Sequence, residues 1–265
     1  MIVEWAAYIG LGLFAGFVAG LLGVGGGLII VPVLSFVFAA HHFSDAYLLH
    51  LALGTSLASI VFTSISSFRA HHAHGAVNWK IWRQVTPGIV TGTLLGSVLA
   101  AHLSTHFLKV FFVIFLFYVG TQMILDIKPK AARELPGRPG MFGAGNVIGV
   151  VSSLVGIGGG TLSVPFMTWC NVKLHDAIGT SAAIGFPIAV AGAAGYVANG
   201  LRVDGLPPYS LGFVYLPALA AIAVASILTA PLGAKLAHRL PVKKLKKIFA
   251  ILLYTLGMRM AWSLF

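Results

Sequence analysis

Long runs without a charged residue fill most of the chain. Four such runs lie in each half, at residues 5–44, 46–68, 84–108 and 110–125 and again at 139–172, 177–201, 205–234 and 248–258. A membrane-spanning helix needs about 20 mainly apolar residues. The connections between the runs are too short for a soluble domain of about 100 residues. The pattern therefore predicts an all-α, polytopic helical membrane protein.

The chain repeats itself. Shifted by 133 positions, residues 10–32 match residues 143–165 at ten positions, seven of them glycine, and shorter blocks match at shifts of 125 and 137. Glycine bias alone would not keep seven glycines in one register. The sequence therefore predicts a first transmembrane repeat at 1–126, a cytoplasmic linker at 127–138 and a second transmembrane repeat at 139–265.

Each half is expected to hold five segments, because its first run is too long for one crossing and has a glycine cluster near its middle. Ten crossings put 14 of the 17 Lys and Arg residues on one side and leave Lys109, Arg202 and Arg259 on the other. Such a bias marks the richer side as cytoplasmic. An odd number of segments per half makes the repeat inverted, as in many secondary transporters. Both termini are then expected on the non-cytoplasmic side.

Composition and charge narrow the function further. Only 9% of the residues are charged, against about 25% in soluble domains, which excludes a soluble enzyme. The net charge is +11, but the basic residues lie between apolar segments, where they orient the chain in the membrane. The charge therefore indicates no nucleic-acid partner. The single cysteine, Cys170, has no partner for an internal disulfide. His71, His72 and His74 have no carboxylate or cysteine beside them, so we expect an interfacial loop, no metal and no cofactor.

Two glycine clusters are the first candidate site. GVGGG (Gly23–Gly27) and GIGGG (Gly156–Gly160) each precede an apolar segment that contains a proline, Pro32 or Pro165. Consecutive glycines break a helix, and the helix that restarts directs its positive dipole end toward the bare N–H groups. Such an arrangement favours an anion. The expected substrate-binding glycines are Gly25, Gly26, Gly27, Gly158, Gly159 and Gly160, and the alternative is a tight, closely packed turn.

The second candidate is the pair HLALGTS (His50–Ser56) and HDAIGTS (His175–Ser181). Its hydroxyls suit an oxyanion because they donate hydrogen bonds without adding charge. The adjacent Gly54 and Gly179 let another backbone approach. These hydroxyls are Thr55, Ser56, Thr180 and Ser181. The alternative is bonding to the preceding turn or between helices. His50 and His175 lie more than one turn earlier, near the site or at the membrane edge. Further glycines at spacings of four predict close helix packing: Gly12, Gly16 and Gly20, Gly145 and Gly149, and Gly88, Gly92 and Gly96.

The acidic residues restrict the mechanism. All six fall at expected segment ends, so no carboxylate is expected at mid-membrane to relay protons or hold a cation. An interior without carboxylates would not repel an anion.

The paired GxGGG segments with a following proline and the paired GTS motifs resemble the TauE/SafE family of sulfite exporters, within the broader group of predicted anion permeases called TSUP. This resemblance covers essentially the whole chain. It implies a bacterial cytoplasmic (inner) membrane, a sulfur oxyanion or sulfonate as substrate, and a site at the glycines and at the Thr and Ser pairs. It also implies about eight spans, which leaves open that the glycine segments are re-entrant.

The sequence thus favours a transporter that exports a small sulfur-containing oxyanion, sulfite before others, by alternating access, with the anion and the lipid bilayer as its partners. One rival is a permease for an organosulfonate or another small organic anion, in either direction. A remote rival is an intramembrane enzyme. We expect no enzyme, because Ser56, Ser181, His50 and His175 have no acidic residue to orient them.

Overall fold

The computed structural model describes residues 2–23, 25–125, 133–237 and 242–264. Within these ranges it contains ten helices and one short β-hairpin, which confirms an all-α protein. The elements are α1 (Ile2–Leu22), α2 (Gly27–Ala40), α3 (Leu48–Ala73), α4 (Trp79–His102), α5 (Thr105–Ile124), α6 (Arg138–Val155), α7 (Gly160–Trp169), α8 (Leu174–Gly200), β1 (Ser210–Leu211), β2 (Val214–Tyr215), α9 (Leu216–Ala237) and α10 (Val242–Trp262).

Six of the described helices are long and apolar enough to cross a membrane: α1 from Glu4 onward, α3, α4, α5, α8 and α9. Helices α2 and α7 have only 14 and 10 residues, or about 21 and 15 Å at a rise of about 1.5 Å per residue. The hydrocarbon core is about 30 Å thick. Helices α2 and α7 are therefore each too short for a full crossing as straight helices.

Helices α1 and α2 form a hairpin, and so do α6 and α7. The Glu4 carboxylate at the start of α1 lies 3.7 Å from Nε2 of His41 at the end of α2. In the second half, the Arg133 guanidinium, just before α6, lies 5.0 Å from the centre of the Trp169 ring at the end of α7. Each hairpin therefore returns to the end of the molecule from which it starts, and its glycine turn lies at the far tip.

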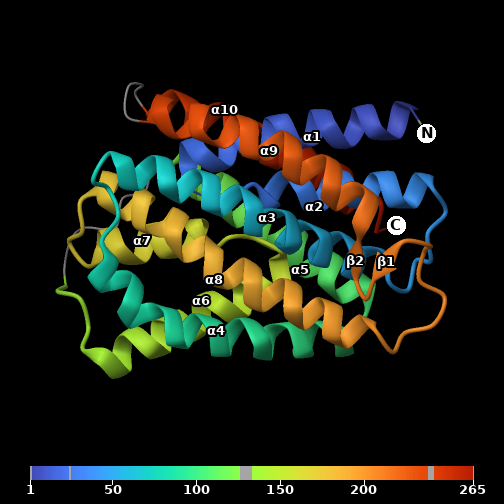
Figure 1. The fold of residues 1–265 in the computed structure, drawn as a ribbon, viewed down its shortest axis with the longest axis horizontal. Helices are drawn as coiled ribbons and strands as arrows, with labels where there is room; N and C mark the ends of the chain where they lie inside the picture. Colours follow the sequence, from blue (N-terminus) through green and yellow to red (C-terminus); the bar gives the residue numbers. More distant parts are fainter. Residues whose placement is uncertain (1, 24, 126–132, 238–241, 265) are drawn as a thin grey trace.

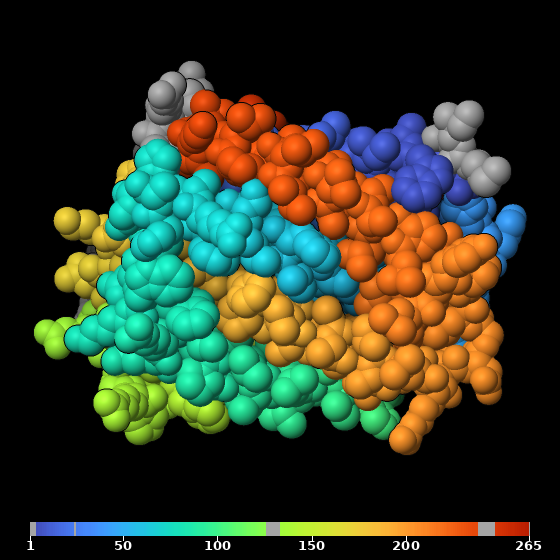
Figure 2. Space-filling model, viewed as in Figure 1, coloured from blue at the N-terminus to red at the C-terminus, as the bar shows by residue number. Residues whose placement is uncertain are grey.

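Helices α3 and α8 form the core. The buried share of the most apolar stretch is 83% in α3 and 78% in α8, against 39–56% in the other four candidate spans. The two helices run in opposite directions, α3 starting at the end where both termini lie and α8 at the other end (Figure 1). In the space-filling view they fill the centre of one face, between α9 and α4 (Figure 2). An element from each half thus lies at the centre.

Glycines at spacings of four bring helices from different halves together. A Cβ added at Gly12 of α1 would lie 2.8 Å from Cβ of Ala225 in α9, and one at Gly96 of α4 would lie 2.9 Å from Cβ of Ser153 in α6. Small residues at such positions allow helix backbones to approach closely. The predicted packing role of these glycines is confirmed, and it joins α1 to α9 and α4 to α6.

Large apolar side chains cover the outside of the peripheral helices. Prominent examples, each more than 60% exposed, are Leu95, Ile114, Val147, Val224 and Leu228, on α4, α5, α6 and α9. In a soluble protein a continuous apolar surface of this kind would be unfavourable. It is the surface that a bilayer requires.

Candidate substrate site

Both glycine clusters end one helix and begin the next. Gly26 and Gly159 are the N-caps of α2 and α7, with φ of 80° and 76°, a left-handed conformation that glycine adopts without steric cost. The first bonds inside the new helices run from the Ile29 and Leu162 N–H groups to the Gly26 and Gly159 carbonyls, both at 3.0 Å. The N–H groups before these donors have no partner within the helix. The positive end of each helix dipole lies there.

The two turns meet inside the protein. A Cβ added at Gly25 would lie 3.0 Å from Cα of Gly158, and one at Gly27 would collide with the Gly156 carbonyl. The tips of the two hairpins are therefore in direct contact. Two helix N-termini, one from each half, lie beside this contact.

The serines of the two GTS motifs hold these turns across the halves. Ser56 of α3 donates a hydrogen bond to the Gly156 carbonyl at 2.8 Å. Ser181 of α8 donates to the Gly23 carbonyl at 3.0 Å and accepts from Ser163 at 3.0 Å. Each half thus fixes the glycine turn of the other.

The threonines contact the connections that precede α9 and α4. Thr55 accepts a hydrogen bond from the Tyr215 N–H at 2.9 Å, and Thr180 accepts one from the Asn78 N–H at 2.8 Å. Gly54 and Gly179 allow this, because an added Cβ would collide with the carbonyls of Phe213 and Ala76. The structure brings each serine to a glycine turn but brings Thr55 and Thr180 to separate connections. A direct contact between these four hydroxyls and the substrate stays a prediction.

The two histidines have different surroundings. His50 is buried, with Nε2 3.0 Å from the Ala100 carbonyl and its ring 5.1 Å from the ring of Phe213. His175 is exposed at the start of α8. Neither lies among the residues that line the cavity described next.

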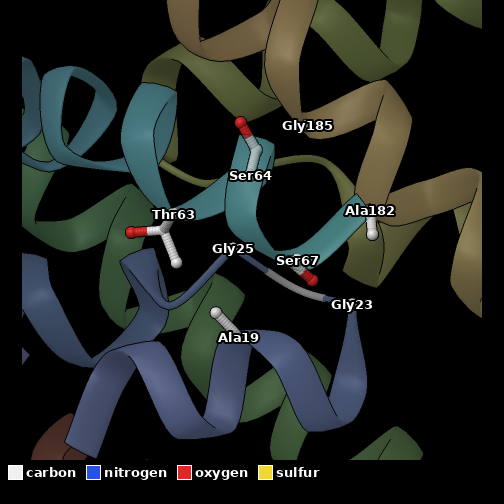
Figure 3. A pocket seen from close by; sticks show the side chains of 8 residues that line it. All are labelled: Ala19, Gly23, Gly25, Thr63, Ser64, Ser67, Ala182 and Gly185. Carbon is white, nitrogen blue, oxygen red and sulfur yellow. The ribbon is translucent and has the colours of Figure 1, made fainter. Parts of the chain in front are cut away.

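A small cavity lies between the first glycine turn, α3 and α8 (Figure 3). Its volume of about 10 Å³ is enough for about one water molecule. No lining residue is charged: they are Ala19, Gly23, Gly25, Thr63, Ser64, Ser67, Ala182 and Gly185. The sequence signal for this surface is the hydroxyls of Ser56, Ser59, Thr63 and Ser67 at spacings of three and four, which occupy one face of a helix.

The lining hydroxyls differ in their hydrogen bonds. Thr63 is 2.6 Å from the Ser226 hydroxyl of α9, and Ser64 donates to the Val61 carbonyl at 3.0 Å. The Ser67 hydroxyl is buried, and within the described part of the chain it has no hydrogen-bond partner. A buried polar group without a partner is uncommon in native proteins.

Comparisons with known proteins identify the family. The family model described as "Sulfite exporter TauE/SafE" matches residues 8–260. The chain belongs to this family. It is accordingly a membrane transporter, as the names of its relatives also indicate.

A "Probable membrane transporter protein" of Haemophilus influenzae is 36% identical over 251 residues, which cover 94% of this chain and 95% of the relative. A "Probable membrane transporter protein" of Methanocaldococcus jannaschii is 27% identical over 94% of this chain and 92% of its own length. No solved structure matches the chain significantly.

Proposed function

We propose that the protein exports a small sulfur-containing oxyanion, sulfite, from the cytoplasm by alternating access. The observation that carries the proposal is the contact of the two glycine turns inside the protein, each with a helix N-terminus beside it. The family name, sulfite exporter, supports the same substrate class.

The physical argument concerns how the anion loses its water. In the apolar interior the bare N–H groups at Gly25–Gly27 and Gly158–Gly160 and nearby hydroxyls replace the hydration shell. A hydrogen bond to a charged group contributes about 1.5 to 3 kcal/mol. No carboxylate lines the cavity beside the first turn, so nothing there repels a negative charge. Ser56 and Ser181 act by holding the turns in place.

The hairpin geometry supports re-entrant glycine segments in an inverted repeat. A re-entrant hairpin returns the chain to the side from which it entered, and so do two successive full crossings. The division of the basic residues, 14 on one side and 3 on the other, is therefore the same in both topologies. The richer end, with Arg69 and Lys80 beside the α3–α4 connection, faces the cytoplasm. Both termini then lie on the other side of a bacterial inner membrane, and rocking of the two repeats exposes the midplane site alternately.

Transport in proteoliposomes tests the substrate. The purified protein is reconstituted and loaded with labelled sulfite, thiosulfate, sulfate or taurine, and efflux is compared with that from protein-free liposomes. We expect sulfite efflux above the other three. Preferred taurine efflux would favour the rival organosulfonate permease, and no efflux of any of the four would refute the proposal.

Accessibility tests the orientation. In a Cys170→Ala background we expect His74→Cys and Asp204→Cys, both at exposed positions, to react with an impermeant thiol reagent from opposite sides of the membrane. Reaction of both from the same side would contradict the topology.

A further inference from the structure

The cavity beside the first glycine turn is lined by residues that the second half does not repeat. Along α3 its wall is formed by Thr63, Ser64 and Ser67. At the shift of 125 positions that relates α3 to α8, these residues correspond to Ile188, Ala189 and Gly192. The three hydroxyls that α3 contributes to the cavity wall are therefore not repeated in α8.

The opposite wall differs in the same direction. Ala182 and Gly185 of α8 face the cavity, whereas their counterparts on α3 are Leu57 and Ile60. Both counterparts are fully buried, and Leu57 Cδ1 would lie 2.8 Å from a Cβ added at Gly192. Large side chains thus occupy on α3 the positions that alanine and glycine occupy on α8.

Ser67 indicates what the open position is for. Ser67 is only 3% exposed and borders the cavity, and its hydroxyl has no hydrogen-bond partner among the described residues. In the close-up view its side chain lies beside Gly23 of the turn (Figure 3). A hydroxyl that is buried, unpaired and next to an empty space is available to a ligand.

We propose that the transported anion is held asymmetrically in this cavity, by the Ser67 hydroxyl and the N–H groups of Gly25, Gly26 and Gly27, with Thr63 and Ser64 forming the cavity wall. The proposal rests on the proposed function and names the residues that contact the substrate. The second turn, packed against Ile188, acts as a structural partner. A cavity of about 10 Å³ holds about one water, so the anion enters when the α1–α2 hairpin and α3 move apart.

The first test removes single hydroxyls and measures efflux kinetics with sulfite, or with whichever of the four anions the wild-type protein transports. We expect Ser67→Ala to raise KM about tenfold or more, because it removes a hydrogen bond to a charged ligand, with a much smaller change in maximal rate. The matched control is Ser35→Ala. Ser35 is equally buried, donates to the Pro32 carbonyl at 2.7 Å and does not line the cavity, so its KM should stay at the wild-type value.

The second test fills the cavity. A Cβ at Gly185 would lie 3.3 Å from the Gly158 carbonyl oxygen and 3.7 Å from Cβ of Ser64, contacts that small shifts accommodate. We expect Gly185→Ala to fold normally, as judged by thermal unfolding in detergent, yet to raise KM at least as much as Ser67→Ala. Gly143→Ala is the control, since an added Cβ there meets nothing within 4 Å.

The outcomes separate the two proposals. Wild-type KM values in both Ser67→Ala and Gly185→Ala, with an active wild-type protein, would overturn the asymmetric site and leave anion export intact. A wild-type protein that moves none of the four anions would overturn the proposed function itself.

Discussion

The two glycine turns have nearly the same backbone but different surroundings. Both cap a short helix with a left-handed glycine, and both accept a hydrogen bond from a serine of the other half. Beside the first turn lie Thr63 and Ser67, whereas the second packs against Ile188 and Ile148, with the Ser152 hydroxyl 3.4 Å from a Cβ added at Gly159. The repeat therefore determines the backbone of the site, and the helix that faces each turn determines its chemistry.

The difference extends to how each turn tolerates a side chain. A Cβ at Gly26 would lie 2.9 Å from the carbonyl oxygen of Ala15, a backbone atom of α1. A Cβ at Gly159 would collide with the end of the Ile188 side chain, which can rotate away. The first turn is thus confined by backbone and the second by a side chain.

The largest expected effect is that of Gly26→Ala on transport. Both Gly26→Ala and Gly159→Ala must hold alanine at a φ near 80°, which costs about 1–2 kcal/mol, equivalent to a factor of about 5–30. At Gly26 the contact with α1 adds to this cost. We therefore expect Gly26→Ala to lower the efflux rate per inserted molecule by more than that factor, and Gly159→Ala to lower it less.

Gly10→Ala in α1 serves as the control, because an added Cβ there has no neighbour within 4 Å. Equal losses in Gly26→Ala and Gly159→Ala would show that the two turns contribute alike, and normal transport in both would reduce the clusters to simple turns.

A smaller and symmetrical effect is expected for the threonines. Thr55→Val and Thr180→Val keep the shape but leave the N–H groups of Tyr215 and Asn78 without their acceptors. Such a loss costs about 1–3 kcal/mol. We expect each variant to be destabilised by this amount, and the double variant by about the sum, since the two sites share no partner.

Kinetics decide whether the threonines do more than this. If the asymmetric site is right, KM stays near the wild-type value in both variants. A tenfold rise in KM in either one would place that hydroxyl on the anion, as the sequence alone suggests.

Much of the fold follows from the sequence because it depends on local residues. Of the seven glycines shared by residues 10–32 and 143–165, all but the first pair mark the helix breaks or the surfaces where α1 meets α9 and α4 meets α6. The lengths of α2 and α7 were harder to predict. Both helices end at His41 and Cys170, whereas the uncharged runs continue to residues 44 and 172.

The site was harder to predict from the sequence for a different reason. Thr55 bonds to a residue 160 positions away and Thr180 to one 102 positions away, so the motif gives no indication that these hydroxyls accept rather than donate. Ser67 has no equivalent hydroxyl in the second half, so the repeat does not single it out. The face formed by Ser59, Thr63 and Ser67 is not repeated in α8, where isoleucine and glycine replace it.

The smallest effects compare the two histidines that begin the repeated motif. His50→Ala would remove a hydrogen bond to the Ala100 carbonyl, which still accepts from the Leu103 N–H, and a ring packed on Phe213, so we expect a loss of stability of at least about 0.5–1.5 kcal/mol. His175 is exposed, and surface substitutions usually stay within about 0.5 kcal/mol. Chemical unfolding in detergent should therefore separate His50→Ala clearly from His175→Ala.

His50→Gln refines the comparison, because the glutamine amide can donate to the Ala100 carbonyl and should recover part of the lost stability. If His175→Ala left stability unchanged but raised KM, the exposed histidine would act on the entering anion. If His50→Gln restored stability but not KM, the buried histidine would have a role in transport beyond packing. Wild-type KM in His175→Ala and in His50→Gln would leave both histidines outside the substrate path. This fits their positions, because the α3 residues that line the cavity lie toward the opposite end of that helix from His50, and the α8 residues that line it follow His175 along the chain.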